Sequence, residues 1–214
     1  MTVPATRRVT LRRAALAAGA LALPAAVRPA PAVAQDEDEA VALEDFLVEA
    51  IVLEQIAGLA SATAAGELDG EPRLSRTLER FERQEQIHAT ALRSALDSIG
   101  VDPPNAPASP DDVGAIEDAD RLDGERAAEL IDLLGELARL GDRDARLEYL
   151  VDLEQEQLRF YLAQAPTLDA EDILRTGAEI AACQAQHVVV LREALGVAPA
   201  EAVPELPDPA DATD

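Results

Sequence analysis

Both histidines of this chain follow an acidic residue or its amide by three positions. His88 follows Glu85, and His187 follows Gln184. In an α-helix, residues three or four positions apart lie on one face, so each pair would present its side chains together. Carboxylate oxygens and imidazole nitrogens suit ions such as iron and manganese. The spacing therefore indicates a metal-binding face on each of two helices.

The first pair lies inside an apolar stripe. Positions spaced by four and three residues share one helix face, and six of the eight side chains on this face are apolar. Because the apolar side chains must face a core, Glu85 and His88 must face it too. A buried carboxylate is costly unless it is paired or coordinates a metal. The stripe consists of Leu74, Leu78, Phe81, Glu85, His88, Leu92, Ala95 and Ile99.

Three further segments carry stripes of the same kind. Gln184 and His187 lie in the middle of one, Glu54 in a second and Glu154 in a third. We predict that all six polar side chains face one common core. The alternative for each histidine, taken alone, is a core histidine hydrogen-bonded to a buried Glu. The neighbours at the same spacing are Ile173, Gly177, Ile180, Leu191 and Ala194, then Leu47, Ala50, Ala57 and Ser61, and finally Val151, Leu158, Tyr161 and Ala165.

An internal repeat relates the two halves of the chain. Glu54 begins a unit that reaches His88 after 34 positions, and Glu154 begins one that reaches His187 after 33. Both Glu residues stand in the tripeptide Leu-Glu-Gln. Each unit thus offers a Glu on its first helix and a Glu/Gln-x-x-His on its second.

The periodicity predicts four amphipathic helices and an all-α class. Ala and Leu, which are strong helix formers, supply most of the apolar content. The expected helices span residues 39–65, 73–99, 143–165 and 171–195. Short connections join the first two and the last two, while residues 101–142 form a long crossover with an additional helix expected over 125–140. Two tight hairpins joined by one long crossover predict an antiparallel four-helix bundle.

One Glu from each of two helices, with E-x-x-H from the other two, resembles the ferritin-like di-iron carboxylate proteins. We expect this ferritin-like bundle to span residues 36–196. The resemblance implies Glu54 and Glu154 as terminal ligands, Glu85 as a bridge between two metal ions, and His88 and His187 as ligands of one ion each. It further implies one or two ions of iron, or manganese, and oxidation of Fe(II) by oxygen or peroxide.

The chain departs from the family pattern at Gln184, where the family has a bridging Glu. A neutral amide bridges poorly, and the loss of a negative charge weakens a site for two cations. One ion, an uneven pair and no ion all stay open at this point. Cys183 could replace the missing carboxylate as a thiolate, but its type better fits a small buried core residue. Tyr161 could lie near a metal, with core packing as the favoured alternative.

Residues 1–34 are expected to be an export signal. Arg7 and Arg8 lie in a segment that resembles a twin-arginine signal, and the apolar stretch 14–27 is too short for a comfortable membrane span. Ala32 and Ala34 supply a small-x-small cleavage pattern, which predicts cleavage before Gln35 and no stable membrane span afterwards. An uncleaved anchor is the alternative. This route would place the mature protein outside the cytoplasm, in a periplasm, a cell wall or the medium.

The strongly negative net charge limits which molecules the protein is expected to bind. With 18 basic and 42 acidic residues, the net charge is -24, which argues against nucleic acid because its binding needs a positive surface. Metal ions are the expected partners, and a homodimer is compatible with the sequence. The single cysteine precludes an intrachain disulfide. Residues 197–214 are acidic and rich in Pro, and we expect them to be disordered.

The favoured function is an exported iron- or manganese-binding protein with ferroxidase-like activity if its site is active. A second interpretation is a non-catalytic extracytoplasmic bundle, for interaction or stress protection, that keeps a degenerate metal site. Gln184 favours the second interpretation, while the complete set of Glu and His ligands elsewhere favours the first. An unrelated helical bundle would require the internal repeat to be a coincidence, and we rank it last.

Overall fold

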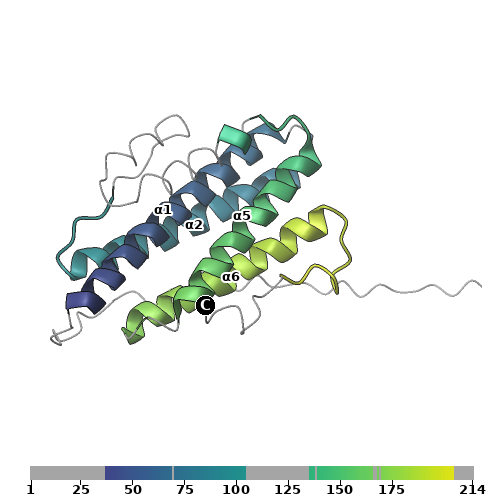
Figure 1. Ribbon diagram of the computed structural model, residues 1–214. Coiled ribbons are helices and arrows are strands. Elements are labelled where there is room, and N and C mark those ends of the chain that lie inside the picture. The colour runs from purple at the N-terminus through teal and green to yellow at the C-terminus, as the bar shows by residue number, and fades with distance from the viewer. Residues whose placement is uncertain are drawn as a thin grey trace, which may run out of the picture.

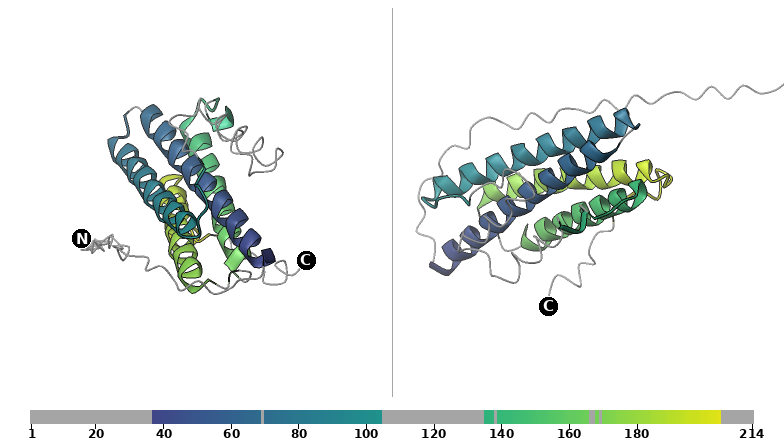
Figure 2. Two further views of the ribbon diagram at one scale, coloured as in Figure 1. Left: turned by 90° about the vertical axis from the view of Figure 1, so that its left-hand side faces the viewer. Right: turned by 90° about the horizontal axis from the view of Figure 1, so that it is seen from above.

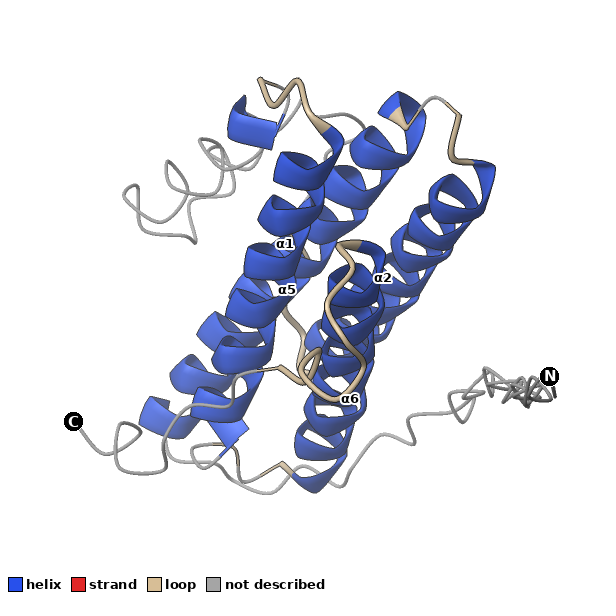
Figure 3. Ribbon diagram, turned by 90° about the vertical axis from the view of Figure 1, so that its right-hand side faces the viewer, coloured by secondary structure: helices blue, strands red, loops and turns tan. Residues whose placement is uncertain are grey.

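The computed structural model describes residues 37–68, 70–104, 135–137, 139–165, 168 and 170–204. These residues form helices, turns and loops without any strand (Figure 3). The four long helices are α1 (Glu37–Glu67), α2 (Pro72–Ser98), α5 (Arg143–Gln164) and α6 (Glu171–Ala194). The all-α prediction is confirmed, and each predicted helix end lies within two residues of the observed one.

Local signals account for several of these helix ends. Asp142 caps the start of α5, where its carboxylate accepts hydrogen bonds from the backbone N–H groups of Asp144 and Ala145. Gly100 follows α2 with φ 83° and Gly196 follows α6 with φ 85°. This left-handed conformation carries no steric cost for glycine, so the chain can leave the helix there.

The helices pack as two hairpins. α1 lies against α2 and α5 against α6, while α1 also contacts α5 and α2 contacts α6 (Figures 1 and 2). Each helix thus has two neighbours around a shared centre, as in an antiparallel four-helix bundle. Of the additional helix expected over 125–140, residues 135–137 are helical and Leu137 packs into the core, whereas 125–134 lie outside the described residues.

Arg143 ties the two hairpins together at one end of the bundle. Its guanidinium donates to the carboxylate of Glu71, which precedes α2, with Nε 2.6 Å from Oε1. A second donor of the same group reaches the carbonyl oxygen of Ala194, the last residue of α6, at 2.9 Å. This one side chain at the start of α5 therefore contacts the ends of two other helices.

α1 is apolar on nearly all of its faces because it is buried on most of them. Sixteen of its residues are buried, from Leu43 to Ala65. Its segment Val41–Glu67 is long and apolar enough to cross a membrane by length and composition, and 72% of the apolar 18-residue window within it is buried inside the protein. A helix that is apolar all round is typical of a core position, and its burial here accounts for its composition.

The predicted stripes are buried with few exceptions. In α2, the positions from Leu78 to Ala95 on the predicted face are all buried. Ile99 is a correction, because it is 42% exposed and Leu96 is buried instead. The physical reason is that α2 ends at Ser98, so Ile99 no longer continues the helical face.

The start of the predicted disordered tail also differs from expectation. Residues 197–204 form a turn, in which the backbone N–H of Ala202 donates to the carbonyl of Ala198 at 3.0 Å. Ala202 is fully buried, and the Arg192 guanidinium of α6 donates to the carbonyl oxygen of Val203. The burial of Ala202 and the hydrogen bond to the Val203 carbonyl hold this segment against the bundle. The signal segment 1–34 and residues 205–214 lie outside the described residues.

Candidate metal centre

Six polar side chains meet in the middle of the bundle. Glu54 comes from α1, Glu85 and His88 from α2, Glu154 from α5, and Gln184 and His187 from α6. All six are buried, and His88 is the most exposed of them at 7%. The structure therefore brings together every ligand position that the sequence predicted. Because each helix contributes at mid-length, the bundle core itself encloses the centre.

The carboxylates and imidazoles form two groups that share one residue. Glu54, Glu85 and His88 form the first group, and Glu85, Glu154 and His187 form the second. In each group, one ligand atom per residue lies within 4.8 Å of the others. Glu85 belongs to both groups, so its two carboxylate oxygens could bridge two ions. Oxygen and nitrogen donors in this arrangement fit iron or manganese.

Both histidines face the centre with Nδ1. Nδ1 of His187 lies 3.1 Å from Oε1 of Glu85 and 3.1 Å from Oε2 of Glu154. Nδ1 of His88 lies 2.9 Å from Oε2 of Glu54 and 3.4 Å from Oε2 of Glu85. Each imidazole nitrogen is therefore positioned between two carboxylates, where a cation could replace its proton.

The other side of His187 is held by α2. Oε1 of Gln84 lies 3.1 Å from its Nε2, and the ring stacks on Phe81 with centroids 3.8 Å apart. Sγ of Cys183 is 3.5 Å from the same Nε2, and Gln84 donates to that sulfur at 3.5 Å. Cys183 lies on the side of the ring away from the carboxylates, so it does not take the place of the missing carboxylate. Neither ligand group includes it.

Donors converge on Glu54. The hydroxyl of Tyr161 donates to Oε1 of Glu54 at 2.7 Å, and Nε2 of Gln157 donates to the same oxygen at 3.4 Å. Nε2 of Gln184 reaches both oxygens, at 3.3 and 3.4 Å. Tyr161 thus contacts the centre through Glu54 on α1 and not through Glu154 on its own helix.

Gln184 acts as a hydrogen-bond donor between two carboxylates. Its Nε2 also donates to Oε2 of Glu85 at 3.0 Å, while its Oε1 is buried and accepts no hydrogen bond among the described residues. The carboxylate oxygens around the amide fix this orientation, since only the nitrogen can donate to them. A ligand oxygen is thus present in the residue but is directed away from the other ligands.

The surroundings of both histidines favour their protonated form. Burial opposes protonation of His88, but hydrogen bonds with Cys183, Glu54 and Glu85 outweigh it and raise the pKa of His88 to about 12. Burial also opposes protonation of His187, yet attraction to Glu154 and hydrogen bonds with Cys183 and Glu154 raise its pKa well above the ordinary value. Metal binding would have to displace these protons.

The pKa values of the neighbouring carboxylates are shifted as well. Burial, and then repulsion from Glu85, raise the pKa of Glu54 well above its usual value. Burial raises the pKa of Glu154 as well, against the opposing attraction of His187. Burial acts in the same direction on Glu85, but hydrogen bonds with Glu54, His187 and His88 outweigh it and lower its pKa. Glu54 is therefore the weaker acid of the Glu54–Glu85 pair.

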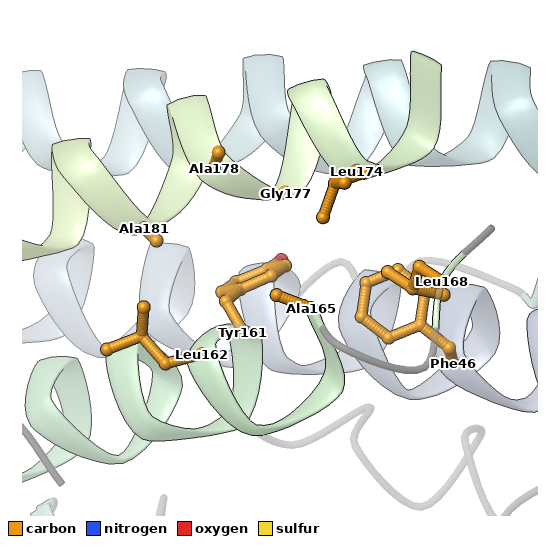
Figure 4. A pocket seen from close by; sticks show the side chains of 9 residues that line it. All are labelled: Phe46, Tyr161, Leu162, Ala165, Leu168, Leu174, Gly177, Ala178 and Ala181. Carbon is orange, nitrogen blue, oxygen red and sulfur yellow. The ribbon is translucent and has the colours of Figure 1, made fainter. Parts of the chain in front are cut away.

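Tyr161 also borders an apolar pocket. Figure 4 shows its ring between α5 and α6, beside Gly177 and Ala181. A Cβ at Gly177 would lie 3.6 Å from Cδ1 of Tyr161, so the ring passes close to the α6 backbone. One side chain thus contacts both the pocket and Glu54. The lining comprises Phe46, Tyr161, Leu162, Ala165, Leu168, Leu174, Gly177, Ala178 and Ala181.

Sequence reasoning missed two residues of the centre. Gln84 was not singled out, although it precedes His88 by four positions as Cys183 precedes His187. Gln157 was not singled out either, although it follows Glu154 by three positions on α5. The internal repeat could have indicated Gln84, because the 99-residue offset from Glu85 to Gln184 also relates Gln84 to Cys183.

Comparison with known families agrees with this geometry. A family model described as a ferritin-like domain matches residues 42–197, a stretch that includes nearly all of α1 and the whole of α2, α5 and α6. No curated protein and no solved structure matches the chain. The family match extends over more than two thirds of the 214 residues. The chain therefore belongs to the ferritin-like domain family.

Proposed function

We propose that this protein is an exported ferritin-like protein that binds iron or manganese at the bundle centre and, with iron, oxidises Fe(II). The observation that carries the proposal is the position of His187. Its Nδ1 lies 3.1 Å from one oxygen of Glu85 and 3.1 Å from one oxygen of Glu154, so three ligand atoms from three helices converge. Such a set offers two negative charges and one nitrogen to a divalent cation.

The residues of the chain have separate tasks in this function. Glu85 and Glu154 would neutralise a divalent cation, and the stack of Phe81 on His187 keeps the imidazole in place. Burial of all the ligands excludes bulk water, which strengthens electrostatic attraction at the centre. Bound iron would supply one-electron chemistry towards oxygen or peroxide.

The proposed export rests on residues 1–34. The twin-arginine route carries folded proteins, which suits a chain that takes up its metal before export. Replacement of Arg7 and Arg8 by Lys is expected to leave the protein in the cytoplasm, as measured by fractionation and immunoblotting. The exported wild-type protein is expected to begin at Gln35, as measured by mass spectrometry. Export of the double Lys variant at the wild-type level would contradict the proposed route.

Metal content is the first test of binding. Protein purified without chelators is expected to contain iron or manganese, measured by inductively coupled plasma mass spectrometry. The His88→Ala/His187→Ala double variant is expected to lose the metal while its far-ultraviolet circular dichroism stays helical. Exposure of the anaerobically Fe(II)-loaded protein to air should then raise its near-ultraviolet absorption faster than in protein-free Fe(II) solution.

A second candidate function is a non-catalytic helical module. It is favoured by Gln184, whose amide donates to Glu54 and Glu85 and so satisfies buried carboxylates without a metal. If wild-type protein stays free of metal even after anaerobic loading, this candidate replaces the first. Capture of binding partners outside the cytoplasm would then be the appropriate experiment.

A further inference from the structure

The two ligand groups at the centre are not equivalent. We propose that the group of Glu85, Glu154 and His187 binds one metal ion tightly, while the group of Glu54, Glu85 and His88 is a weak site that Gln184 keeps closed. This inference rests on the proposed metal binding and assigns it to one half of the centre.

In the weak half of the centre, formed by Glu54, Glu85 and His88, the carboxylate of Glu54 already accepts hydrogen bonds. Both oxygens of Glu54 have donors, since Tyr161 contacts Oε1 at 2.7 Å and His88 contacts Oε2 at 2.9 Å. The amide nitrogen of Gln184 lies within 3.4 Å of both oxygens of Glu54 and 3.0 Å from Oε2 of Glu85. A cation between Glu54 and Glu85 would therefore meet N–H groups that point at its own ligands.

In the tight half of the centre, formed by Glu85, Glu154 and His187, the carboxylate oxygens have few hydrogen-bond donors. Oε1 of Glu85 is buried and lies 3.1 Å from Nδ1 of His187, and no other donor in the described residues bonds to it. In the same part of the chain, the carboxylate of Glu154 makes one side-chain hydrogen bond, with that same Nδ1 at 3.1 Å. An ion that replaces the proton on Nδ1 would gain both carboxylates without breaking any other side-chain contact of Glu154.

The charges of the ligands also favour a single ion. Glu54, Glu85 and Glu154 supply three negative charges when ionised. One divalent ion leaves one negative charge, which lies on Glu54 among its donors. Two divalent ions leave an uncompensated positive charge in a fully buried centre, where unpaired charge is costly.

Gln184 is the residue that sets this difference between the halves. Its Oε1 is buried and unpartnered, so the residue could offer a ligand oxygen only by turning its amide away from three hydrogen-bonded carboxylate oxygens. A carboxylate at this position would have no N–H to donate and would add the missing charge. Gln184→Glu is therefore expected to open the second site.

The test is an anaerobic titration of the full chain with Mn(II), followed by calorimetry. Wild-type protein is expected to bind one ion tightly, and Gln184→Glu two. Glu154→Gln should weaken the tight site roughly 100-fold, because it removes the negative charge of a direct ligand, and the effect of Glu54→Gln on that site should be about 10-fold smaller. The two Glu→Gln changes are matched in shape and charge, and circular dichroism verifies that each variant is folded.

The outcomes separate this inference from the proposed function. Two ions of equal affinity in wild-type protein would overturn the inference while leaving metal binding intact. Loss of the tight site in Glu54→Gln but not in Glu154→Gln would also overturn it. No binding to wild-type protein at any Mn(II) concentration, repeated with Fe(II), would overturn both proposals.

Discussion

Oε1 of Gln84 lies 3.1 Å from Nε2 of His187 and accepts its hydrogen bond, which leaves Nδ1 facing Glu85 and Glu154. This contact fixes which nitrogen of the imidazole can bind a metal. It crosses from α2 to α6, so it also fixes the ring relative to the helix that carries Glu85. Gln84 therefore holds the ring of His187 with Nδ1 towards Glu85 and Glu154.

Removal of this acceptor should weaken metal binding. Loss of an outer hydrogen bond to a metal-ligating histidine typically costs about 10–100-fold in affinity, and we expect about 10-fold for Gln84→Ala because Cys183 stays 3.5 Å from the same nitrogen. Calorimetric titration with Mn(II) measures the change. Gln86→Ala is the matched control, since Gln86 is exposed and, in the described part of the chain, the side-chain hydrogen bond of its amide is to Glu82 on the same helix. Equal affinities in the two variants would show that Gln84 does not position His187.

The burial of the six candidate ligand residues could be predicted from sequence, because periodicity alone determines which residues share a buried face. Glu85 and His88 stand between Phe81 and Leu92 in a regular stripe, and the family resemblance supplied the rest of the arrangement. Periodicity gives the face of a helix but not the partner across the bundle. Tyr161 illustrates this limit, since it shares a face with Glu154 but bonds Glu54 on another helix.

The role of Gln184 also depends on geometry that no one-dimensional pattern contains. The sequence left one ion, an uneven pair and no ion open. The direction of its amide, with nitrogen on Glu54 and Glu85 and oxygen unpartnered, is what distinguishes the two halves. Similarly, burial of Ala202 depends on a contact with the bundle that the acidic, Pro-rich composition of the tail does not predict.

Tyr161 should stabilise the metal-free protein through its hydroxyl. Tyr161→Phe removes the 2.7 Å hydrogen bond to Glu54 and is expected to lower the free energy of unfolding by about 1–2 kcal/mol. The effect stays moderate because Gln157 and Gln184 still donate to the same oxygen. Urea denaturation in the presence of a chelator measures it.

The chain supplies a matched control for this change. The hydroxyl of Tyr149 is buried and makes no hydrogen bond among the described residues, so Tyr149→Phe should change stability by less than about 0.5 kcal/mol, or raise it. A larger loss in Tyr149→Phe than in Tyr161→Phe would contradict the assigned contact with Glu54.

A substitution in α6 should raise stability. Gly177 lies inside the helix, and a Cβ there would make ordinary contact with Tyr161 at 3.6 Å. Alanine is favoured over glycine in a helix interior by about 1 kcal/mol, so Gly177→Ala should raise the free energy of unfolding by up to that amount. Gly196→Ala should instead lower it by about 1–2 kcal/mol, because φ is 85° at that position. Urea denaturation measures the free energy of unfolding of both variants. A Gly177→Ala variant less stable than Gly196→Ala would show that the added methyl group displaces Tyr161.

The stability of the metal-free protein should fall as pH rises above neutrality. The pKa of His88 is raised to about 12 and that of His187 is raised well above 6.5, so the folded state binds more protons than the unfolded state. Their stabilisation is complete below the unfolded value of 6.5 and is lost as pH rises through the folded values. The lowered pKa of Cys183 acts in the opposite direction, but one thiol is outweighed by two imidazoles.

Melting temperatures measured with a chelator between pH 6.5 and 9 test this slope. The chain has only two histidines, so the His88→Ala/His187→Ala variant lacks their contribution to the slope, and the dependence on pH that stays in it comes from the raised pKa values of Glu54 and Glu154. Added Mn(II) replaces protons at the centre, and its stabilising effect should therefore be larger at pH 8 than at pH 6.5. A metal-free melting temperature that rises with pH in wild-type protein would show that the imidazoles are neutral in the folded state. The carboxylates would then have to be held by their other donors, Tyr161, Gln157 and Gln184.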